Sequence, residues 1–426
     1  MAATLSDDFR ARGLIADASQ GWTEHLASGS RTLYVGFDPT ADSLHVGSLL
    51  PLLALRRAQL AGHRPIVLVG GGTGLIGDPS GKAGERALNP KDVVREWAQR
   101  LKQQVSPFLD FDCGRTSAVL ADNYEWISEL DVLTMLRDVG KHFSIGVMLA
   151  KESVKARLQT GISYTEFSYQ VLQAYDFLCL LRRHGCTVQM GGSDQWGNIT
   201  AGIDLIRRVD GRAAFGLTLP LVTKSDGSKF GKTESGTIWL DPERTSAYEM
   251  YQFWLNTADR DVVEFLKYFT FLPLERIAEL AAATERSPDR REGQRVLARE
   301  VTQLVHGAEA VREAERSTAA VFEKGAPDQS DGGAADGGAL PGAFVHASEP
   351  QFLWSILKDA GIVASASEAR RLITQGGVAV DHRRVPDTDF KLGAGQYLVQ
   401  VGKRRFWRVF VGPEHETRPW QAQARK

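Results

Sequence analysis

The sequence predicts an α/β protein with a parallel main sheet, followed by a helical region and a small α+β module. Three observations support this prediction. Short apolar runs alternate with helical patterns in the first half of the chain, helical patterns alone occupy residues 246–322, and a glycine-rich stretch then precedes a short basic module. Repeated strand–loop–helix units build a parallel sheet with helices on its faces.

The strands of this sheet are predicted from apolar runs that end in glycine or turn residues. TLYVGF (32–37) precedes a helix predicted over 48–60, and RPIVLVGG (64–71) precedes a glycine-rich loop. TVQMGG (187–192) precedes the helical pattern SDQWGNITAGIDLIRRV. In such sheets ligands bind beyond the carboxyl ends of the strands, where the glycines of this chain gather.

Residues 325–342 mark the clearest boundary in the chain. They include six glycines, two prolines and three aspartates but no aromatic residue. Such a segment cannot bury enough apolar surface to offset its ordering entropy, so we expect a flexible linker. After it, QFLWSILKDAG and SASEARRLITQGG predict two helices, VAVDHRRV predicts a strand, and QYLVQVGKRRFWRVFV predicts two strands joined by a basic turn.

The overall composition is that of a globular protein in water. Of the 426 residues, 43% are hydrophobic and 24% are charged. No apolar run approaches the ~20 residues of a membrane span, and the N-terminal residues lack the apolar core of a signal peptide. The three cysteines are scattered without CxxC spacing, which argues against a disulfide framework or a zinc site and favours the cytoplasm.

Charge is distributed unevenly along the chain. From residue 349 onward there are 13 lysines and arginines against 8 aspartates and glutamates, whereas the preceding residues carry 38 basic and 44 acidic side chains. A basic module on an acidic body suggests a polyanionic partner for the module, with a chance imbalance of surface charge as the alternative.

The loop after the second predicted strand contains GTGLIG (72–77), a literal G-x-G-x-x-G. A dinucleotide fingerprint requires this turn to run straight into a helix, and DPSG (78–81) prevents one. A P-loop would need glycine at position 76 and serine or threonine at position 83, where the chain has isoleucine and alanine. What remains is a glycine-rich loop with Lys82 and Arg86, which is suited to close over phosphates or is simply solvated.

His45 and Gly47 stand where a helix is expected to begin. Pro51 is tolerated only in the first turn of a helix, which places the start near Gly47 or Ser48. Gly47 would let a base or phosphate approach the backbone, and His45 could donate a hydrogen bond to a phosphate oxygen. A histidine with a purely structural role is the alternative.

The segment KFGKTESG (229–236) carries two lysines three residues apart, in a loop rich in glycine, serine and threonine. Two lysines in such a loop cannot share a core. They form either a solvated turn or a flexible cationic clamp for a pyrophosphate group.

In this order the motifs resemble the class I aminoacyl-tRNA synthetases. HVGS (45–48) is similar to the family's His-Ile-Gly-His element, and KFGKT (229–233) is similar to its Lys-Met-Ser-Lys-Ser element. Nearly the whole chain resembles the bacterial tyrosyl-tRNA synthetase family, in the stretches LYVGFDPTADSLHVG, GGTGLIGDPSGK, DVGKHFS, GISYTEFSYQVLQAYDF, GGSDQWGNI and FGKTESGTIWLD. The tail, in SEARRLITQGGVAV, resembles the small RNA-binding domain first described in ribosomal protein S-four.

The resemblance implies a fold and an organisation into domains. We expect a Rossmann-like parallel-sheet catalytic domain over residues 1–223, which would bind tyrosine and ATP and form a homodimer through residues 126–158. A KMSKS-type loop and an α-helical anticodon-arm domain would follow over 224–324, then the linker over 325–348 and a small α+β RNA-binding domain over 349–426.

The implied reaction joins L-tyrosine to tRNA(Tyr). Tyrosine and ATP would form tyrosyl-adenylate and pyrophosphate, and the tyrosyl group would then pass to the 3′ end of the tRNA. ATP would be a substrate accompanied by Mg²⁺, with no metal site in the chain itself and no permanently bound cofactor. Ser48 replaces the second histidine of the family element, and we expect altered nucleotide contacts rather than lost activity.

The resemblance also assigns roles to single residues. The tyrosine pocket would be formed by Tyr34, Gly36, Asp38, Asp78, Tyr169, Gln173, Asp176 and Gln195. ATP would contact His45, Gly47, Ser48, Gly192, Asp194 and Lys232. Catalytic groups acting on the phosphates would be Thr40, His45, Lys82, Arg86, Lys229, Lys232 and Thr233. The cations expected to bind RNA are Arg370, Arg371, Arg383, Arg384, Lys403, Arg404 and Arg405.

Within the pocket, Tyr34 and Asp176 would hold the phenolic hydroxyl. Tyr169, Gln173 and Asp176 are spaced i, i+4 and i+7, which places them on one helix face. A carboxylate and an amide would be unsatisfied in a core, so a polar pocket wall is the better interpretation. Two alternatives remain open, a tryptophan-specific synthetase and a non-catalytic RNA-binding paralogue.

Overall fold

The computed structural model describes residues 4–80, 88–151, 154–155, 161–225, 230–233, 236–322, 342–347, 349–381, 383–402 and 405–413. The chain divides into two compact units. The first comprises residues 1–231, 239–241 and 258–293, and the second comprises 232–238, 242–257 and 294–426. The helices of region 246–322 are therefore shared between both units, whereas the sequence suggested one helical domain over 224–324.

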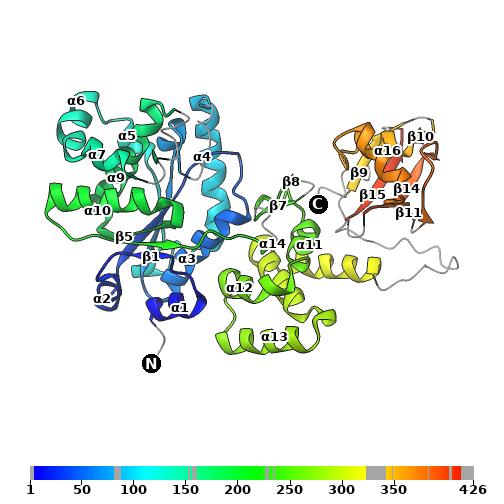
Figure 1. Ribbon diagram of the computed structural model, residues 1–426, viewed down its shortest axis with the longest axis horizontal. Helices are drawn as coiled ribbons and strands as arrows, with labels where there is room; N and C mark the ends of the chain where they lie inside the picture. Colours follow the sequence, from blue (N-terminus) through cyan, green and yellow to red (C-terminus); the bar gives the residue numbers. More distant parts are fainter. Residues whose placement is uncertain are drawn as a thin grey trace. The chain divides into compact units, whose positions relative to one another are not determined.

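The first unit is built around a six-stranded sheet (Figure 1). Its strands are β1 (Asp17–Ala18), β2 (Thr32–Phe37), β3 (Arg64–Val69), β4 (Val119–Asp122), β5 (Cys186–Gly192) and β6 (Phe215–Leu219). The strand order is β1-β6-β5-β2-β3-β4, and all neighbours are parallel except the short edge strand β1, which is antiparallel to β6. The predicted parallel sheet is confirmed, with β2 near its centre.

Helices cover both faces of this sheet. The helices of the first unit are α1 (Leu5–Arg12), α2 (Trp22–Ala27), α3 (Leu49–Leu60), α4 (Lys91–Val105), α5 (Tyr124–Ile127), α6 (Val132–Thr134), α7 (Ile145–Leu149), α9 (Tyr164–His184), α10 (Trp196–Asp210), α12 (Asp259–Phe269) and α13 (Leu274–Arg286). Helices α9 and α10 lie side by side (Figure 1) and share a buried cluster with the strand residues Tyr34, Ile66 and Leu68. Helix α3 contacts β2 and β3 without joining that cluster, so it covers the opposite face.

Short turns of tighter or wider helix connect these elements. They are the 3₁₀ turns at Val46–Ser48, Thr73–Leu75, Ser106–Phe108, Gly114–Thr116, Gly140–His142, Ser193–Gln195 and Pro288–Arg290, and a π-helical turn at Met135–Val139. The first of them leads directly into α3, so the helix begins within two residues of the start predicted from Pro51.

Capping interactions define both ends of helix α9. The side chain of Ser163 accepts a hydrogen bond from the backbone N–H of Glu166, which satisfies a donor at the first turn. Gly185 ends the helix in the left-handed conformation, at φ 63°. These caps fix the register in which α9 presents its side chains to the sheet.

The second unit contains helices α11 (Ala247–Leu255) and most of α14 (Glu292–Phe322), and a two-stranded sheet of β7 (Lys232–Thr233) and β8 (Gly236–Thr237). Ser246 and Glu249 form a reciprocal capping box at the start of α11. Helix α14 is interrupted at Gly307, whose φ of 85° is not helical.

The tail of the second unit folds into a small α+β domain. Its elements are β9 (Gly342–His346), β10 (Gln351–Phe352), α15 (Leu353–Asp359), α16 (Ala366–Thr374), β11 (Val378–Val380), β12 (Arg383–Arg384), β13 (Lys391–Leu392), β14 (Gly395–Val401) and β15 (Arg405–Gly412). Five of the strands form a sheet in the order β12-β11-β14-β15-β9, and β10 pairs with β13.

This domain differs from the sequence prediction in two places. Residues 342–346 fall in the segment expected to be a linker, yet they form β9, which pairs in parallel with β15 and buries Ala343 and Val345 in the core. The domain thus begins before residue 349. The run predicted as one strand over 378–385 is a hairpin of β11 and β12, because Asp381 adopts a positive φ of 48° and turns the chain.

Candidate active site

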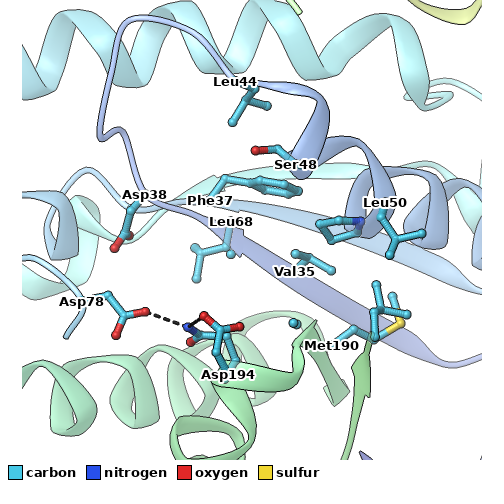
Figure 2. A pocket seen from close by; sticks show the side chains of 18 of the residues that line it. Val35, Phe37, Asp38, Leu44, Ser48, Leu50, Leu68, Asp78, Met190 and Asp194 are labelled. Carbon is cyan, nitrogen blue, oxygen red and sulfur yellow. Dashed lines mark hydrogen bonds between the residues drawn. The ribbon is translucent and has the colours of Figure 1, made fainter. Parts of the chain in front are cut away.

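A cavity of about 460 Å³ opens at the carboxyl edge of the sheet in the first unit. Its lining includes Asp38, just after β2, Gly70, just after β3, Gly192 at the end of β5 and Leu219 at the end of β6. Figure 2 shows Asp38, Asp78, Asp194 and Ser48 around this one space. The location agrees with the rule that open parallel sheets bind ligands beyond their strand ends.

The cavity brings together many of the residues proposed from the sequence. Those that line it are Tyr34, Gly36, Asp38, Thr40, His45, Gly47, Ser48, Asp78, Tyr169, Gln173, Asp176, Gly192, Asp194 and Gln195. The residues at i, i+4 and i+7 of α9 therefore face the same space, as their spacing predicts.

The deep end of the cavity holds a hydroxyl and an amide oxygen that lack hydrogen-bond partners within the described structure. Tyr34 on β2 is 1% exposed, and its Oη has no partner there. Gln189 on β5 is its register neighbour across the sheet, and its buried Oε1 is also unpaired within the described structure. Buried polar atoms without partners are costly, so a ligand with a polar group at this end would satisfy them.

Asp176 lies at the same end and is held by two donors. Trp126 Nε1 donates to its Oδ1 at 2.7 Å, and Asn123 Nδ2 donates to its Oδ2 at 2.9 Å. Burial nevertheless raises the pKa of the Asp176 carboxyl to about 8, because desolvation outweighs the two hydrogen bonds that favour the charged form. Desolvation, and then the charge of Asp176, also raise the pKa of the Tyr34 hydroxyl.

A second group of polar contacts lies along the side of the cavity. Tyr169 Oη donates to Asp38 Oδ2 at 2.7 Å, and Thr73 Oγ1 donates to the other oxygen of Asp38 at 2.7 Å. Burial, and then the charge of Asp38, raise the pKa of Tyr169, so its hydroxyl stays protonated.

Asp78 is linked to the opposite wall through amide side chains. Gln195 Nε2 donates to Asp78 Oδ2 at 2.7 Å, the contact drawn as a dashed line in Figure 2. Gln173 and Asn198 donate in turn to Gln195 Oε1, at 3.3 Å and 3.2 Å. The acidic and amide oxygens of this wall form a place suited to a cationic group.

His45 forms the N-cap of the turn that leads into α3. Its Nδ1 accepts a hydrogen bond from the backbone N–H of Gly47 at 2.9 Å, which makes Nε2 the donor of the neutral ring. A Cβ on residue 47 would lie 2.6 Å from Cε1 of His45, so glycine is required there for the ring to keep this place.

Comparison with known proteins places this site in a family. The model for tRNA synthetases class I (W and Y) matches residues 27–323, and the S4 domain model matches residues 354–396. The tyrosine–tRNA ligase of Desulfitobacterium hafniense is 52% identical over 417 residues, covering 95% of this chain and 99% of that protein. This chain belongs to the tyrosyl-tRNA synthetase family. The tyrosine–tRNA ligase of Bacillus caldotenax is likewise 52% identical over 407 residues, covering 93% of this chain and 97% of that protein.

Solved structures agree with this membership. The C-terminally truncated mitochondrial tyrosyl-tRNA synthetase of Aspergillus nidulans matches with a TM-score of 0.69 and 30% identity, over 75% of this chain and 94% of that chain. A tryptophanyl-tRNA synthetase of Encephalitozoon cuniculi bound to tryptophan matches with a TM-score of 0.51 and 13% identity, over 72% of this chain and 87% of that chain, which shows a shared fold. The family and fold class predicted from the sequence are confirmed.

The structure describes only part of the two cationic loops that were predicted from the sequence. Lys82, Arg86 and Lys229 lie outside the described residues, and Lys232 and Thr233 are described only as the backbone of β7. Their proposed action on phosphates stays a prediction.

The predicted RNA-binding residues lie on two elements of the small domain. Arg370 and Arg371 are on α16, Arg383 and Arg384 form β12, and all four are exposed. Lys403 and Arg404 lie outside the described residues, and Arg405 is described only as the backbone at the start of β15.

Sequence reasoning missed several residues of the cavity. Asn123 and Trp126 hold Asp176, while Thr73 supports Asp38 and Gln189 reaches the deep end. Asn123 directly follows β4, so a polar residue after a parallel strand was the available signal. That strand has only four residues and a weak apolar pattern, which is why it was not predicted.

The described residues contain neither a candidate metal cluster nor a candidate membrane-spanning helix. No group of three or more histidine, cysteine, aspartate or glutamate side chains in the described part of the chain could hold a metal ion. No helix there is both long enough and apolar enough to cross a membrane.

Proposed function

We propose that this chain activates L-tyrosine with ATP and transfers the tyrosyl group to the 3′ end of tRNA(Tyr). The observation that carries the proposal is that Tyr34 Oη and the carboxyl of Asp176 both lie at the deep end of the cavity, where they could form hydrogen bonds with a phenolic hydroxyl. Phenylalanine would leave Tyr34 Oη without a partner, and the loss of that hydrogen bonding opposes its binding. An indole ring offers no hydroxyl at this place.

The wall formed by Asp78, Tyr169 and Gln173 would hold the ammonium group of tyrosine. The carboxylate of Asp78 supplies a charge opposite to that of the ammonium, and the hydroxyl and amide oxygens accept its remaining hydrogens. Gln195, which already bonds Asp78, would place the tyrosine carboxylate next to the nucleotide.

In the first step, a tyrosine carboxylate oxygen attacks the α-phosphorus of ATP. The new O–P bond makes an acyl phosphate. The bond from the α-phosphorus to the oxygen that bridges to the β-phosphorus breaks, and pyrophosphate leaves with that electron pair. The carboxylate is already a nucleophile, so no general base is needed. The chain contributes position and stabilises the charge that develops on the phosphates.

Residues at the start of α3 would contact the nucleotide. His45 can donate through Nε2 to a phosphate oxygen, and Gly47 leaves the backbone open to close approach. Gly192 and Asp194 lie across the cavity, where ribose contacts are proposed. Mg²⁺ would arrive with ATP and neutralise phosphate charge, and the predicted loop lysines and Arg86 would add to it.

We also propose a homodimer and a cytoplasmic location. The described part of the predicted interface carries five strongly exposed apolar side chains, Val132, Leu133, Leu136, Ile145 and Val147. Solvent-exposed apolar groups in such number favour burial against a second copy. The free cysteines fit a reducing compartment, which cell fractionation would check.

An ATP–pyrophosphate exchange assay with each amino acid tests the proposed reaction. We expect exchange with tyrosine, with phenylalanine and tryptophan giving far less. Exchange driven by tryptophan would favour the tryptophan-specific alternative, and no exchange with any amino acid would favour a non-catalytic RNA-binding paralogue. Charging of a tRNA(Tyr) transcript with labelled tyrosine tests the second step.

A further inference from the structure

Four side chains of the small domain contact one another in sequence, a cation over each end of an aromatic pair, and we name them the cation–aromatic column. The guanidinium carbon of Arg370 lies 3.9 Å from the centre of the Trp354 ring. The rings of Trp354 and Phe352 are stacked, with centres 5.7 Å apart and planes within 18°. Lys391 Nζ lies 4.4 Å from the centre of the Phe352 ring.

The column is fixed by the fold beneath it. Phe352 and Lys391 are direct register partners on the antiparallel strands β10 and β13. Trp354 is in the first turn of α15, next to the fully buried Leu353, and it packs against the core. Buried Ala369 orients α16 so that its neighbour Arg370 remains exposed. Three separate stretches of the chain thus converge on one surface.

The cations of the column have no acidic partners within the part of the chain that the structure describes. Within the described residues, neither Arg370 nor Lys391 forms an ion pair with a carboxylate. Two other cations that lie over rings do form such pairs: Arg57 pairs with Asp8, and Arg183 pairs with Glu125. The column also belongs to the part of the chain with a surplus of basic residues. This charge is complementary to a polyanion and unbalanced without one.

We propose that the cation–aromatic column binds an unpaired nucleobase of the tRNA. The inference rests on the proposed function and assigns this part of the RNA contact to base stacking as well as to phosphate charge. The Arg370 guanidinium lies over the Trp354 ring, and because Arg370 is exposed, a base can stack on the guanidinium from solvent. Lys391, on a flexible stem at the other end, pairs with a backbone phosphate.

Stacking makes a prediction that phosphate binding alone does not. Phosphate contacts release counterions, so their contribution falls steeply as salt rises. Stacking of a base on a ring or guanidinium plane neutralises no phosphate and releases no counterions, so it depends less on salt. Removal of the plane while the charge is kept therefore separates the two contributions.

The experiment measures binding of a tRNA(Tyr) transcript to the full chain at low and moderate salt. The variants are Trp354→Leu, which keeps an apolar group on the core, and Arg370→Lys, which keeps the charge but loses the plane. We expect each to weaken binding about ten-fold, by a similar factor at both salt concentrations. The matched control is Phe390→Leu, an exposed aromatic residue outside the column, which should bind as the unchanged chain does.

Three outcomes would overturn the proposal: full affinity in both column variants, losses that disappear at moderate salt, or an equal loss in Phe390→Leu. Arg370→Lys alters an exposed side chain, so it keeps the test valid if Trp354→Leu fails to fold. Tyrosine-dependent pyrophosphate exchange is measured on every variant. If the column variants keep both their pyrophosphate exchange and their tRNA affinity, only the proposed role of the column is rejected. If the unaltered chain shows no exchange, the proposed function is rejected.

Discussion

The carboxyl of Asp176 shows how one buried residue links the cavity to the stability of the fold. It receives hydrogen bonds on both oxygens, yet its pKa rises to about 8 because the side chain is buried. In the unfolded chain the same carboxyl titrates near 3.8. Between these two values the folded protein holds a proton that the unfolded chain has released.

Asp176→Asn is therefore expected to change how stability depends on pH. The raised pKa contributes stability that is fully present below about pH 4 and is lost as pH rises through about 8, with a slope of about 1.4 kcal/mol per pH unit. Asparagine does not titrate, so the difference in unfolding free energy between the two proteins should change steadily across this window. Denaturant titrations at a series of pH values measure it, and a pH-independent difference would contradict the assignment.

Gly47→Ala should impair activation without weakening tyrosine binding. The added Cβ would stand 2.8 Å from Nδ1 of His45 and push the ring away from its hydrogen bond. Loss of one aligned donor at the phosphates is expected to slow pyrophosphate exchange about ten-fold or more. Equilibrium dialysis should show unchanged tyrosine affinity, since the deep end of the cavity is unaltered.

A double variant tests the route of this effect. If Gly47→Ala acts through His45, then adding it to His45→Ala should cost nothing further. Additive losses would show instead that the backbone at Gly47 contacts the nucleotide independently of the ring.

Single residues differ in how well the sequence predicts them. Tyr169, Gln173 and Asp176 share a helix face, and their spacing alone placed them on one wall. Asn123 and Trp126 contact Asp176 across about 50 positions of chain, and no local pattern encodes such a pairing. Residues that support a site through long-range contacts are visible only once the strands are in order.

At the scale of elements, α6 and α7 combine short length with exposed apolar side chains. Leu133 is 77% exposed and Ile145 is 62% exposed, whereas most apolar side chains of α9 are buried. Three- and five-residue helices gain little from their own hydrogen bonds, so outside packing is needed to hold them. A second copy of the chain would supply that packing.

Leu133→Glu should therefore favour the monomer. A carboxylate buried at an apolar interface without a partner costs several kcal/mol, which is enough to dissociate a dimer at micromolar concentration. Leu60→Glu is the matched control, because Leu60 is 62% exposed on α3, outside the predicted interface. Sedimentation velocity compares them. A monomeric unaltered chain, or dissociation of the Leu60 variant as well, would remove the proposed interface.

Among the elements, the central strands and long helices follow from apolar periodicity, and two features of the small domain do not. Strand β9 has only five residues and comes after a glycine-rich segment, so its sequence looks like a linker. Its order comes from parallel pairing with β15, which is more than 60 residues later in the chain. Non-local pairing of this kind leaves no mark in a local pattern.

At the scale of the whole molecule, truncation after Pro341 should separate the two steps of the reaction. The cut removes β9 together with the rest of the small domain, so no unpaired strand is left behind. We expect tyrosine-dependent pyrophosphate exchange to persist and tRNA charging to fall strongly, most of all at low salt, where phosphate contacts are strongest. Paired assays on the same preparation measure both.

Truncation after Ala347 provides a comparison with truncation after Pro341. It keeps β9 but removes β15, which exposes Ala343 and Val345 and an unpaired strand edge. We expect the chain truncated after Ala347 to aggregate more than the chain truncated after Pro341.

Equal loss of pyrophosphate exchange and tRNA charging in the Pro341 truncation would mean that the small domain supports the catalytic fold. That result would contradict the proposal that the small domain binds RNA.

The strand order also has a consequence for synthesis on the ribosome. Strand β2 lies between β3 and β5, so β2 and β3 can pair early, but β5 and β6 are complete only once Leu219 has emerged. At about 5–20 residues per second, the nascent chain spends several seconds with the β5 side of β2 uncovered. During that interval it presents an apolar strand edge to its neighbours on a crowded polysome. We therefore expect chaperone contact to concentrate on nascent chains that end between β3 and β6, and slow codons in that stretch to lower the yield of folded protein.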